Sequence, residues 1–210
     1  MNRAFFAYVV TPSLLLLGAC ASSINHVNAD RYYELALQAE ANGNWAGARQ
    51  AYSRALVNAR LGGAQVGYVS AVTYNLGRMV GYECDYDEAE RLLLEALSLE
   101  ERVTPANTAN LTKRWSELAR LSFDQGKYKS SADWYAKAIP ELERLGVLAS
   151  DPIGFARYIE DYSDALDKAS DVAATTWRKR ASDLRNSNPT KSASFLPTYY
   201  RDRCAKRSSG

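Results

Sequence analysis

Residues 42–56 read NGNWAGARQAYSRAL, and residues 83–97 and 125–139 repeat the pattern as ECDYDEAERLLLEAL and QGKYKSSADWYAKAI. Each stretch opens with turn-forming residues, continues with Trp or Tyr, and then places small and apolar residues three or four positions apart. That spacing is typical of one face of a helix. A Leu followed by Ala or Gly stands seven to eight residues before each turn, in a segment with the same period. The pattern therefore predicts a helix, a tight turn and a second helix, three times over.

These three copies resemble the tetratricopeptide repeat, a helix–turn–helix unit. The positions that match its motif are Leu35, Ala36, Gly43, Trp45, Ala48, Tyr52 and Ala55, then Leu76, Gly77, Tyr86, Ala89, Leu93 and Ala96, then Trp115, Leu118, Ala119, Gly126, Tyr128, Tyr135 and Ala138. Cys84 departs from the motif, because the other two copies have Gly there. The resemblance implies an all-α fold, a right-handed α-solenoid of three to four helix–turn–helix repeats.

The repeats are longer than the standard unit. Trp45 and Tyr86 are 41 residues apart and Tyr86 and Tyr128 are 42 apart, against about 34 in the standard repeat. We interpret the difference as about one extra turn in each helix, as in the 42-residue class of these repeats. A degenerate fourth copy follows, as is common at the end of a solenoid. The expected repeat domain is 29–185, with copies at about 29–62, 70–103, 112–145 and 155–185.

The N-terminus has the features of an export signal. A positive start is followed by an apolar run and by small residues, which together predict a signal peptide over residues 1–19. Leu17-Gly18-Ala19-Cys20 resembles the lipobox of bacterial lipoproteins, which implies cleavage after Ala19 and lipidation of Cys20. The alternatives are a plain signal peptide with an ordinary Cys20 thiol, and an uncleaved anchor. Residues 20–28 are then the lipidated cysteine and a polar tether.

The residue after Cys20 bears on location. Ala21 stands where an Asp would favour retention in the inner membrane. We therefore expect a lipid anchor in the outer membrane with the domain facing the periplasm, or in the cell membrane if the source is Gram-positive.

The chain offers little for catalysis. His26 is its single histidine and lies in the predicted tether. None of the common phosphate-binding, zinc-protease or nucleophile motifs occurs. The acids around Asp85 and Glu88 suit the start of a helix, where negative charge complements the helix dipole. We therefore expect no enzyme activity, no metal and no cofactor.

The C-terminal residues 186–210 differ in charge from the rest. They carry a net charge of +4, whereas residues 20–185 carry −3. A basic tail can attract anionic lipid or nucleic acid, but a flexible, solubilising end is the favoured interpretation, with no nucleic-acid partner. Cys84 and Cys204 could pair in an oxidising compartment. Sequence alone does not bring them within reach of each other, and unpaired thiols are the favoured interpretation.

The resemblance implies a concave face lined by the first helix of each pair. The predicted partner-binding groove consists of Tyr33, Leu37, Tyr74, Arg78, Tyr82, Lys113, Ser116, Arg120 and Phe123. Aromatic and basic residues together suit a peptide that carries carboxylates and apolar side chains, although several of these tyrosines could simply pack between helices. The expected function is a protein–protein interaction adaptor in assembly of an envelope complex, such as pilus, secretion or export machinery. The alternative is an accessory lipoprotein that regulates a cell-wall enzyme or binds peptidoglycan. The sequence identifies neither the partner nor the oligomeric state.

Overall fold

The structure is a computed structural model that describes the backbone of residues 13–194 and 197–208, with side chains for residues 22–194 and 197–205. Within these ranges the regular structure is entirely helical. The helices are α1 (Ser13–Ala41), α2 (Trp45–Gly62), α3 (Val66–Tyr82), α4 (Tyr86–Glu100), α5 (Thr108–Asp124), α6 (Tyr128–Arg144), α7 (Val147–Ser150), α8 (Pro152–Lys168), α9 (Ala174–Asn186) and α10 (Tyr200–Ser208).

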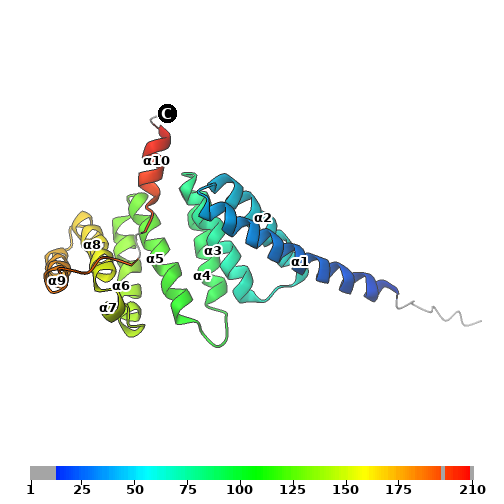
Figure 1. The fold of residues 1–210 in the computed structure, drawn as a ribbon, viewed down its shortest axis with the longest axis horizontal. Coiled ribbons are helices and arrows are strands. Elements are labelled where there is room, and N and C mark those ends of the chain that lie inside the picture. The colour runs from blue at the N-terminus through cyan, green and yellow to red at the C-terminus, as the bar shows by residue number, and fades with distance from the viewer. Residues whose placement is uncertain (1–12, 195–196, 209–210) are drawn as a thin grey trace, which may run out of the picture.

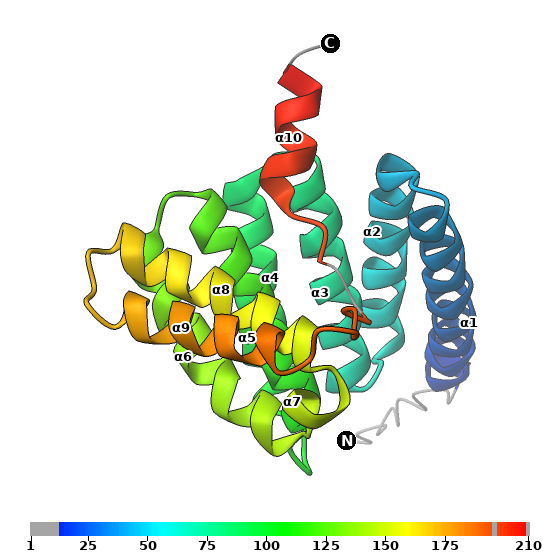
Figure 2. The same ribbon diagram turned by 60° about the vertical axis from the view of Figure 1, so that its left-hand side comes forward.

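Consecutive helices form antiparallel pairs that stack in series. The pairs are α1/α2, α3/α4, α5/α6 and α8/α9, with the short α7 joining the third pair to the fourth. Figures 1 and 2 show the pairs side by side, from α1 and α2 at one end to α8 and α9 at the other. The predicted all-α solenoid is confirmed.

The turn inside each pair has one residue with a left-handed backbone. Gly43 and Gly126 have φ of +68° and +75°, and the non-glycine residues Cys84 and Ser170 have φ of +72° and +61°. Polar side chains at the next residue cap the second helices of two pairs. Asn44 accepts a hydrogen bond from the Gly47 N–H and Asp85 accepts one from the Glu88 N–H.

Small residues let the paired helices approach closely. Ala36, Ala48 and Ala89 are fully buried. A Cβ added to Gly77 would lie 3.1 Å from the Leu93 side chain. These are positions where the repeat motif has small residues, and in the structure they lie at the contacts between paired helices.

A buried polar cluster joins the second pair to the third. Arg114 Nη2 on α5 lies 3.0 Å from Glu100 Oε2 on α4, and both side chains are at most 3% exposed. Ser70 Oγ on α3 donates to the same carboxylate at 2.8 Å, and Asn110 donates to its other oxygen at 3.0 Å. The Arg114 guanidinium also lies over the Tyr74 ring. The cluster fastens three helices to one another.

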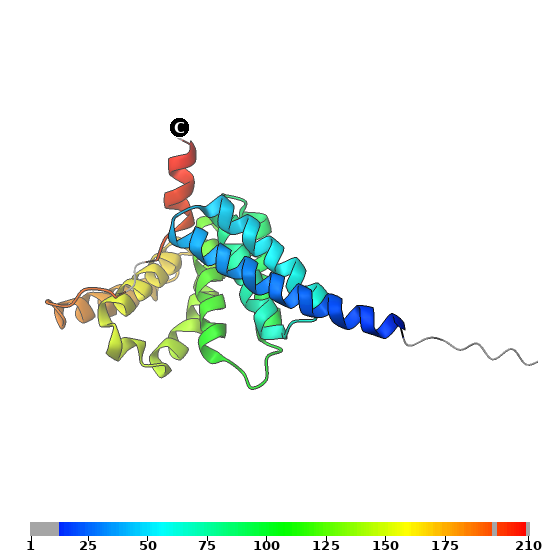
Figure 3. The ribbon, with the colours of Figure 1, turned by 45° about the vertical axis from the view of Figure 1, so that its right-hand side comes forward.

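The N-terminal segment differs from the expectation of a tether. Residues 20–28 are helical and belong to α1, which runs without a break into the repeat domain (Figure 3). Ser22 Oγ donates to the Gly62 carbonyl at 2.7 Å, so α1 already contacts α2 there. Residues 1–12 of the predicted signal peptide lie outside the described residues, as does the Cys20 side chain.

Candidate functional site

A cleft of about 1110 Å³ lies on the face formed by the first helices of the four pairs. Its lining comes mainly from α1, α3, α5 and α8, with contributions from α7 and from residues 197–198. The polar, charged and aromatic side chains that line it include Tyr33, Glu40, Tyr74, Arg78, Tyr82, Lys113, Ser116, Glu117, Arg120, Arg157, Tyr158 and Asp161.

Seven of the nine predicted groove residues line this cleft. They are Tyr33, Tyr74, Arg78, Tyr82, Lys113, Ser116 and Arg120. Leu37 does not line it. Phe123 lies in a smaller neighbouring pocket, where the guanidinium of Arg201 covers its ring. That the seven residues bind a partner stays a prediction.

Two of the predicted basic residues already have acidic partners inside the cleft. Arg78 Nη2 lies 2.8 Å from Glu40 Oε1, and Arg120 Nη2 lies 2.8 Å from Glu117 Oε2. The hydroxyl of Tyr74 also donates to Glu117, at 3.1 Å. Burial disfavours the charge on Glu117, but Arg120 and Arg78 outweigh burial and lower the pKa of its carboxyl. These cations are therefore largely neutralised and hold the cleft's shape.

Two other cations face the cleft without a carboxylate partner within 4 Å among the described side chains. Lys113 is exposed on α5. Arg157 on α8 donates its Nε–H to the Tyr199 hydroxyl at 3.3 Å, and its guanidinium lies over the Tyr199 ring. Sequence reasoning missed Arg157 because the fourth repeat matches the motif poorly. The free positive charge of the cleft thus lies between α5 and α8.

The C-terminal segment was expected to be a flexible tail, and that expectation is wrong for residues 197–204. Pro197 and Thr198 form part of the cleft wall. Tyr199 and Tyr200 are 7% and 0% exposed. Figures 1 and 2 show the segment crossing from the fourth pair to the top of α3 and α5, where α10 begins. The tail is an integral part of the concave face.

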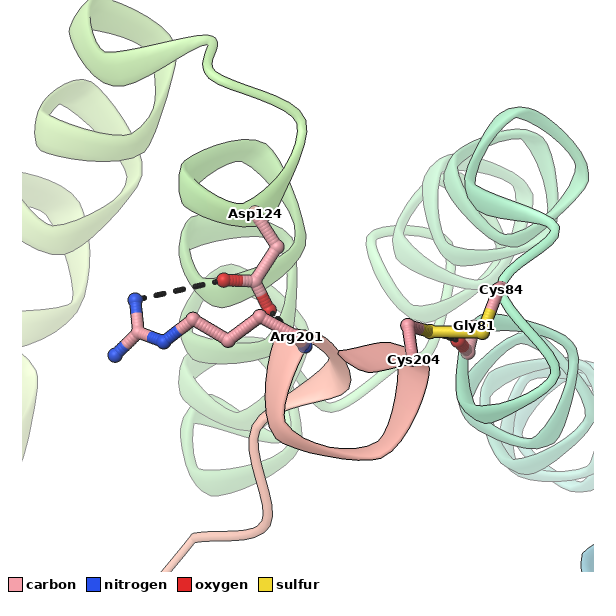
Figure 4. The surroundings of a disulfide bond; sticks show 5 residues. All are labelled: Gly81, Cys84, Asp124, Arg201 and Cys204. Atoms are coloured by element: carbon pink, nitrogen blue, oxygen red, sulfur yellow. Dashed lines mark hydrogen bonds and ion pairs between the residues drawn. A yellow bond between two sulfur atoms is a disulfide. The ribbon is translucent and has the colours of Figure 1, made fainter. Parts of the chain in front are cut away.

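The two cysteines are also paired, contrary to the interpretation as free thiols. Cys84 and Cys204 form a disulfide across a sequence separation of 120 residues (Figure 4). Cys84 occupies the left-handed turn position between α3 and α4, and Cys204 lies in the first turns of α10. The unusual Cys in the repeat motif was the available signal, because the turn itself would favour Gly there.

In the described part of the chain, no three His, Cys, Asp or Glu side chains gather in a way that could hold a metal ion. Over the same residues, no helix combines the length and apolar character needed to cross a membrane.

The architecture defines the chain as a tetratricopeptide-like α-solenoid, and comparisons with solved structures agree. BtubC (BKLC) from P. vanneervenii superposes with a TM-score of 0.68 and 21% identity, over 81% of this chain and 70% of that one. The TPR-like repeats of a kinesin light chain from Podosopora anserina give a TM-score of 0.61 and 12% identity, over 87% and 100% of the two chains. At these identities the likeness concerns the fold. No protein-family model and no curated protein sequence matches the chain.

Proposed function

We propose that the chain is an exported lipoprotein, anchored through Cys20 in the outer membrane, that acts as a non-enzymatic adaptor in an envelope assembly. Its cleft binds an extended protein segment that carries carboxylates and apolar side chains. The observation that carries the binding role is that Lys113 and Arg157 have no carboxylate partner within 4 Å among the described side chains, in a cleft that also presents Tyr33, Tyr74, Tyr82 and Tyr158. Open clefts with an apolar lining and a few convergent polar groups are the usual form of binding sites.

Two further observations support the export part of the proposal. The residues 17–20 resemble a lipobox, and the Cys84–Cys204 disulfide is typical of proteins outside the reducing cytosol. Stable anchoring needs more than one acyl chain, since a single chain binds a membrane only marginally. Lipoprotein acylation supplies several.

The binding role is tested by crosslinking in the source cells. A photoreactive residue replaces Lys113, which is exposed at the cleft, and a matched one replaces Lys129, an exposed lysine outside the cleft lining. We expect one dominant envelope protein to be captured from position 113 and not from position 129. The double variant Lys113→Glu, Arg157→Glu, probed from Tyr158, should lose that capture, because like charges would then face the partner's carboxylates.

Other outcomes decide against this function. Equal capture from positions 113 and 129 would show that the cleft is not the working surface. Capture of glycan strands in place of a protein would favour peptidoglycan binding.

The anchor is tested separately, by following incorporation of labelled palmitate and the membrane fraction. Cys20→Ser should abolish both, and label that persists in this variant would refute lipidation at Cys20.

A further inference from the structure

The C-terminal segment occupies the concave face as a bound peptide would. The Tyr200 ring lies 5.0 Å from the Tyr82 ring and 6.3 Å from the Tyr86 ring, measured between centroids. Its hydroxyl donates to Glu117 Oε1 at 2.5 Å. The side chain is fully buried. An aromatic side chain with a satisfied hydroxyl in a desolvated pocket is the usual form of an interface anchor.

The pocket for this tyrosine depends on a missing side chain. A Cβ added to Gly81 would lie 2.5 Å from Tyr200 Cε1 and 2.8 Å from Cδ1, closer than any real contact. Gly81 is in the last turn of α3 and does not have a left-handed backbone. Its role here is therefore the space it leaves. The absence of a side chain at Gly81 gives α3 room for the Tyr200 ring.

Arg201, the residue that follows Tyr200, binds to the carboxylate of Asp124. The Arg201 backbone N–H donates to Asp124 Oδ2 at 3.0 Å, and its guanidinium Nη1 lies 3.5 Å from Asp124 Oδ1 (Figure 4). The Asp124 side chain is 1% exposed, yet its Oδ1 accepts no hydrogen bond. Burial raises the pKa of this carboxyl in spite of Arg201. The chain's own arginine therefore satisfies the buried acid only in part.

The segment is secured next to this pocket by a covalent bond. Cys204 lies one helical turn after Tyr200, and its partner Cys84 lies three residues after Gly81. Both cysteines are half-buried. Apart from Tyr199 and Tyr200, the described side chains of residues 187–202 are largely exposed. The disulfide thus closes the end of a segment whose buried side chains are Tyr199 and Tyr200.

We propose that Gly81, Tyr82, Tyr86, Glu117 and Asp124 form a recognition slot for a protein segment that presents a tyrosine followed by a basic residue. The chain's own residues 199–204 fill this slot as a resident competitor. The Cys84–Cys204 disulfide keeps the competitor in place. Lys113 and Arg157 are not members of the slot, although Tyr82 and Glu117 also line the cleft and Arg157 contacts Tyr199. The slot binds a different segment and does not depend on the lipid anchor, so it goes beyond the proposed function.

Opening of the slot is a thiol–disulfide exchange. A dithiol reductant attacks one sulfur of the Cys84–Cys204 bond, forms a mixed disulfide and releases the other cysteine as a thiol. The reductant's second thiol then displaces the first cysteine. The reductant ends as its own disulfide and both cysteines end as thiols. Tyr200 and Arg201 can then exchange with a partner segment whose cation hydrogen-bonds Asp124 Oδ1.

The test uses the full chain and a fluorescent peptide of residues 197–203, followed by fluorescence anisotropy. The open form carries Cys84→Ser, Tyr200→Ala, Arg201→Ala and Cys204→Ser, which leaves the tail in place but unable to occupy the slot. We expect the peptide to bind this form at least about tenfold more tightly than oxidised wild type, since a tethered competitor acts at roughly millimolar effective concentration. A peptide with Ala in place of its second tyrosine should not bind.

A matched pair of glycine variants identifies the binding site. Gly81→Ala in the open form should weaken the peptide at least about tenfold, because the new methyl group fills the ring position. Gly67→Ala, also on α3, should leave binding unchanged, because its Cβ would meet only Val103 at an ordinary 3.5 Å. Circular dichroism confirms that each variant is folded. The proposal is overturned if the folded open form does not bind, if Gly81→Ala binds equally well, or if oxidised wild type binds as tightly as the open form.

Discussion

The four turns of the solenoid show how single residues set the backbone. All four pairs place one residue in the left-handed region, and Gly occupies that position in two of them. Cys84 and Ser170 hold the same conformation with a side chain, at roughly 1–2 kcal/mol for a residue with a Cβ. At Cys84 the left-handed residue is the one that forms the disulfide with Cys204. No hydrogen bond is found for the Ser170 side chain among the described residues.

Ser170→Gly should therefore stabilise the protein. We expect a gain of about 0.5–1 kcal/mol in the free energy of unfolding, since relief of backbone strain exceeds the added chain entropy of Gly. Urea unfolding of both proteins measures the difference. Ser187→Gly is the control, because Ser187 has φ of −77° and gains nothing from Gly. A loss of stability in Ser170→Gly would contradict this account of the turn.

Asp161 gives a pH dependence at the same scale. Burial raises the pKa of its carboxyl to about 6, although the Tyr199 hydroxyl and nearby arginines favour the charged form. The unfolded value is about 3.9. A carboxyl whose pKa is higher in the folded state stabilises the protein fully below the unfolded pKa and loses that contribution as pH rises through 6.

Asp161→Asn keeps an acceptor for Tyr199 and removes the titration. We expect the stability of the variant relative to wild type to increase as the pH rises from about 4 to 7, measured by urea unfolding across that range. Thr175→Ser is the control, because Thr175 is exposed and the change alters no titratable group, so the same comparison should stay flat. A constant or shrinking advantage for Asp161→Asn would show that burial does not govern this carboxyl.

At the scale of helices, the buried cluster of Ser70, Glu100 and Arg114 determines how the second pair meets the third. Each member is on a different helix, so the cluster resists sliding of one pair against the other. Removing one partner of a buried ion pair leaves an uncompensated charge, at a cost of about 3–5 kcal/mol. We expect that loss for Arg114→Met, measured by urea unfolding. Arg178→Met removes a half-exposed pair with Asp164 and should cost less than about 1 kcal/mol. Similar losses would contradict the assigned role.

The helical pairs could be predicted from sequence because their signals are local. Turn residues, small crossing residues and the apolar period all fall within one repeat of about 42 residues. The sequence did not predict that the charged residues Glu100, Arg114 and Glu117 are buried. A charged residue in a helix is expected to be exposed to solvent unless a partner from another helix is known. Seven of the nine residues predicted for the groove line the cleft, since the resemblance implied that the first helix of each pair faces it; their role in binding stays a prediction.

At the scale of the whole molecule, the tail contacts are the part that sequence could not supply. Tyr200 reaches Glu117 across 83 residues and Cys204 reaches Cys84 across 120. No local pattern encodes such distances. The disulfide closes a loop through more than half the chain, and constraint of the unfolded state makes such a loop strongly stabilising.

Reduction should therefore lower the free energy of unfolding by about 2–5 kcal/mol. Urea unfolding with and without a phosphine reductant measures the loss. The variant Cys84→Ser, Cys204→Ser should already show the lower stability and should not respond to the reductant. A wild type that is unchanged on reduction would show that the cross-link does not constrain the unfolded chain.

The unbroken run of α1 has a mechanical consequence. Two residues after Cys20, Ser22 already contacts the end of α2. A lipid at Cys20 would therefore be attached to the helix α1 itself and not to a flexible linker. The direction in which the cleft faces, measured about the axis of α1, would then depend on the position of the anchored residue around the helix. One residue inserted between Cys20 and Ser22 would rotate the anchor by about 100° about the axis of α1 and shift it by about 1.5 Å. Spacing at this point would therefore steer the direction in which the protein faces its neighbours on the membrane.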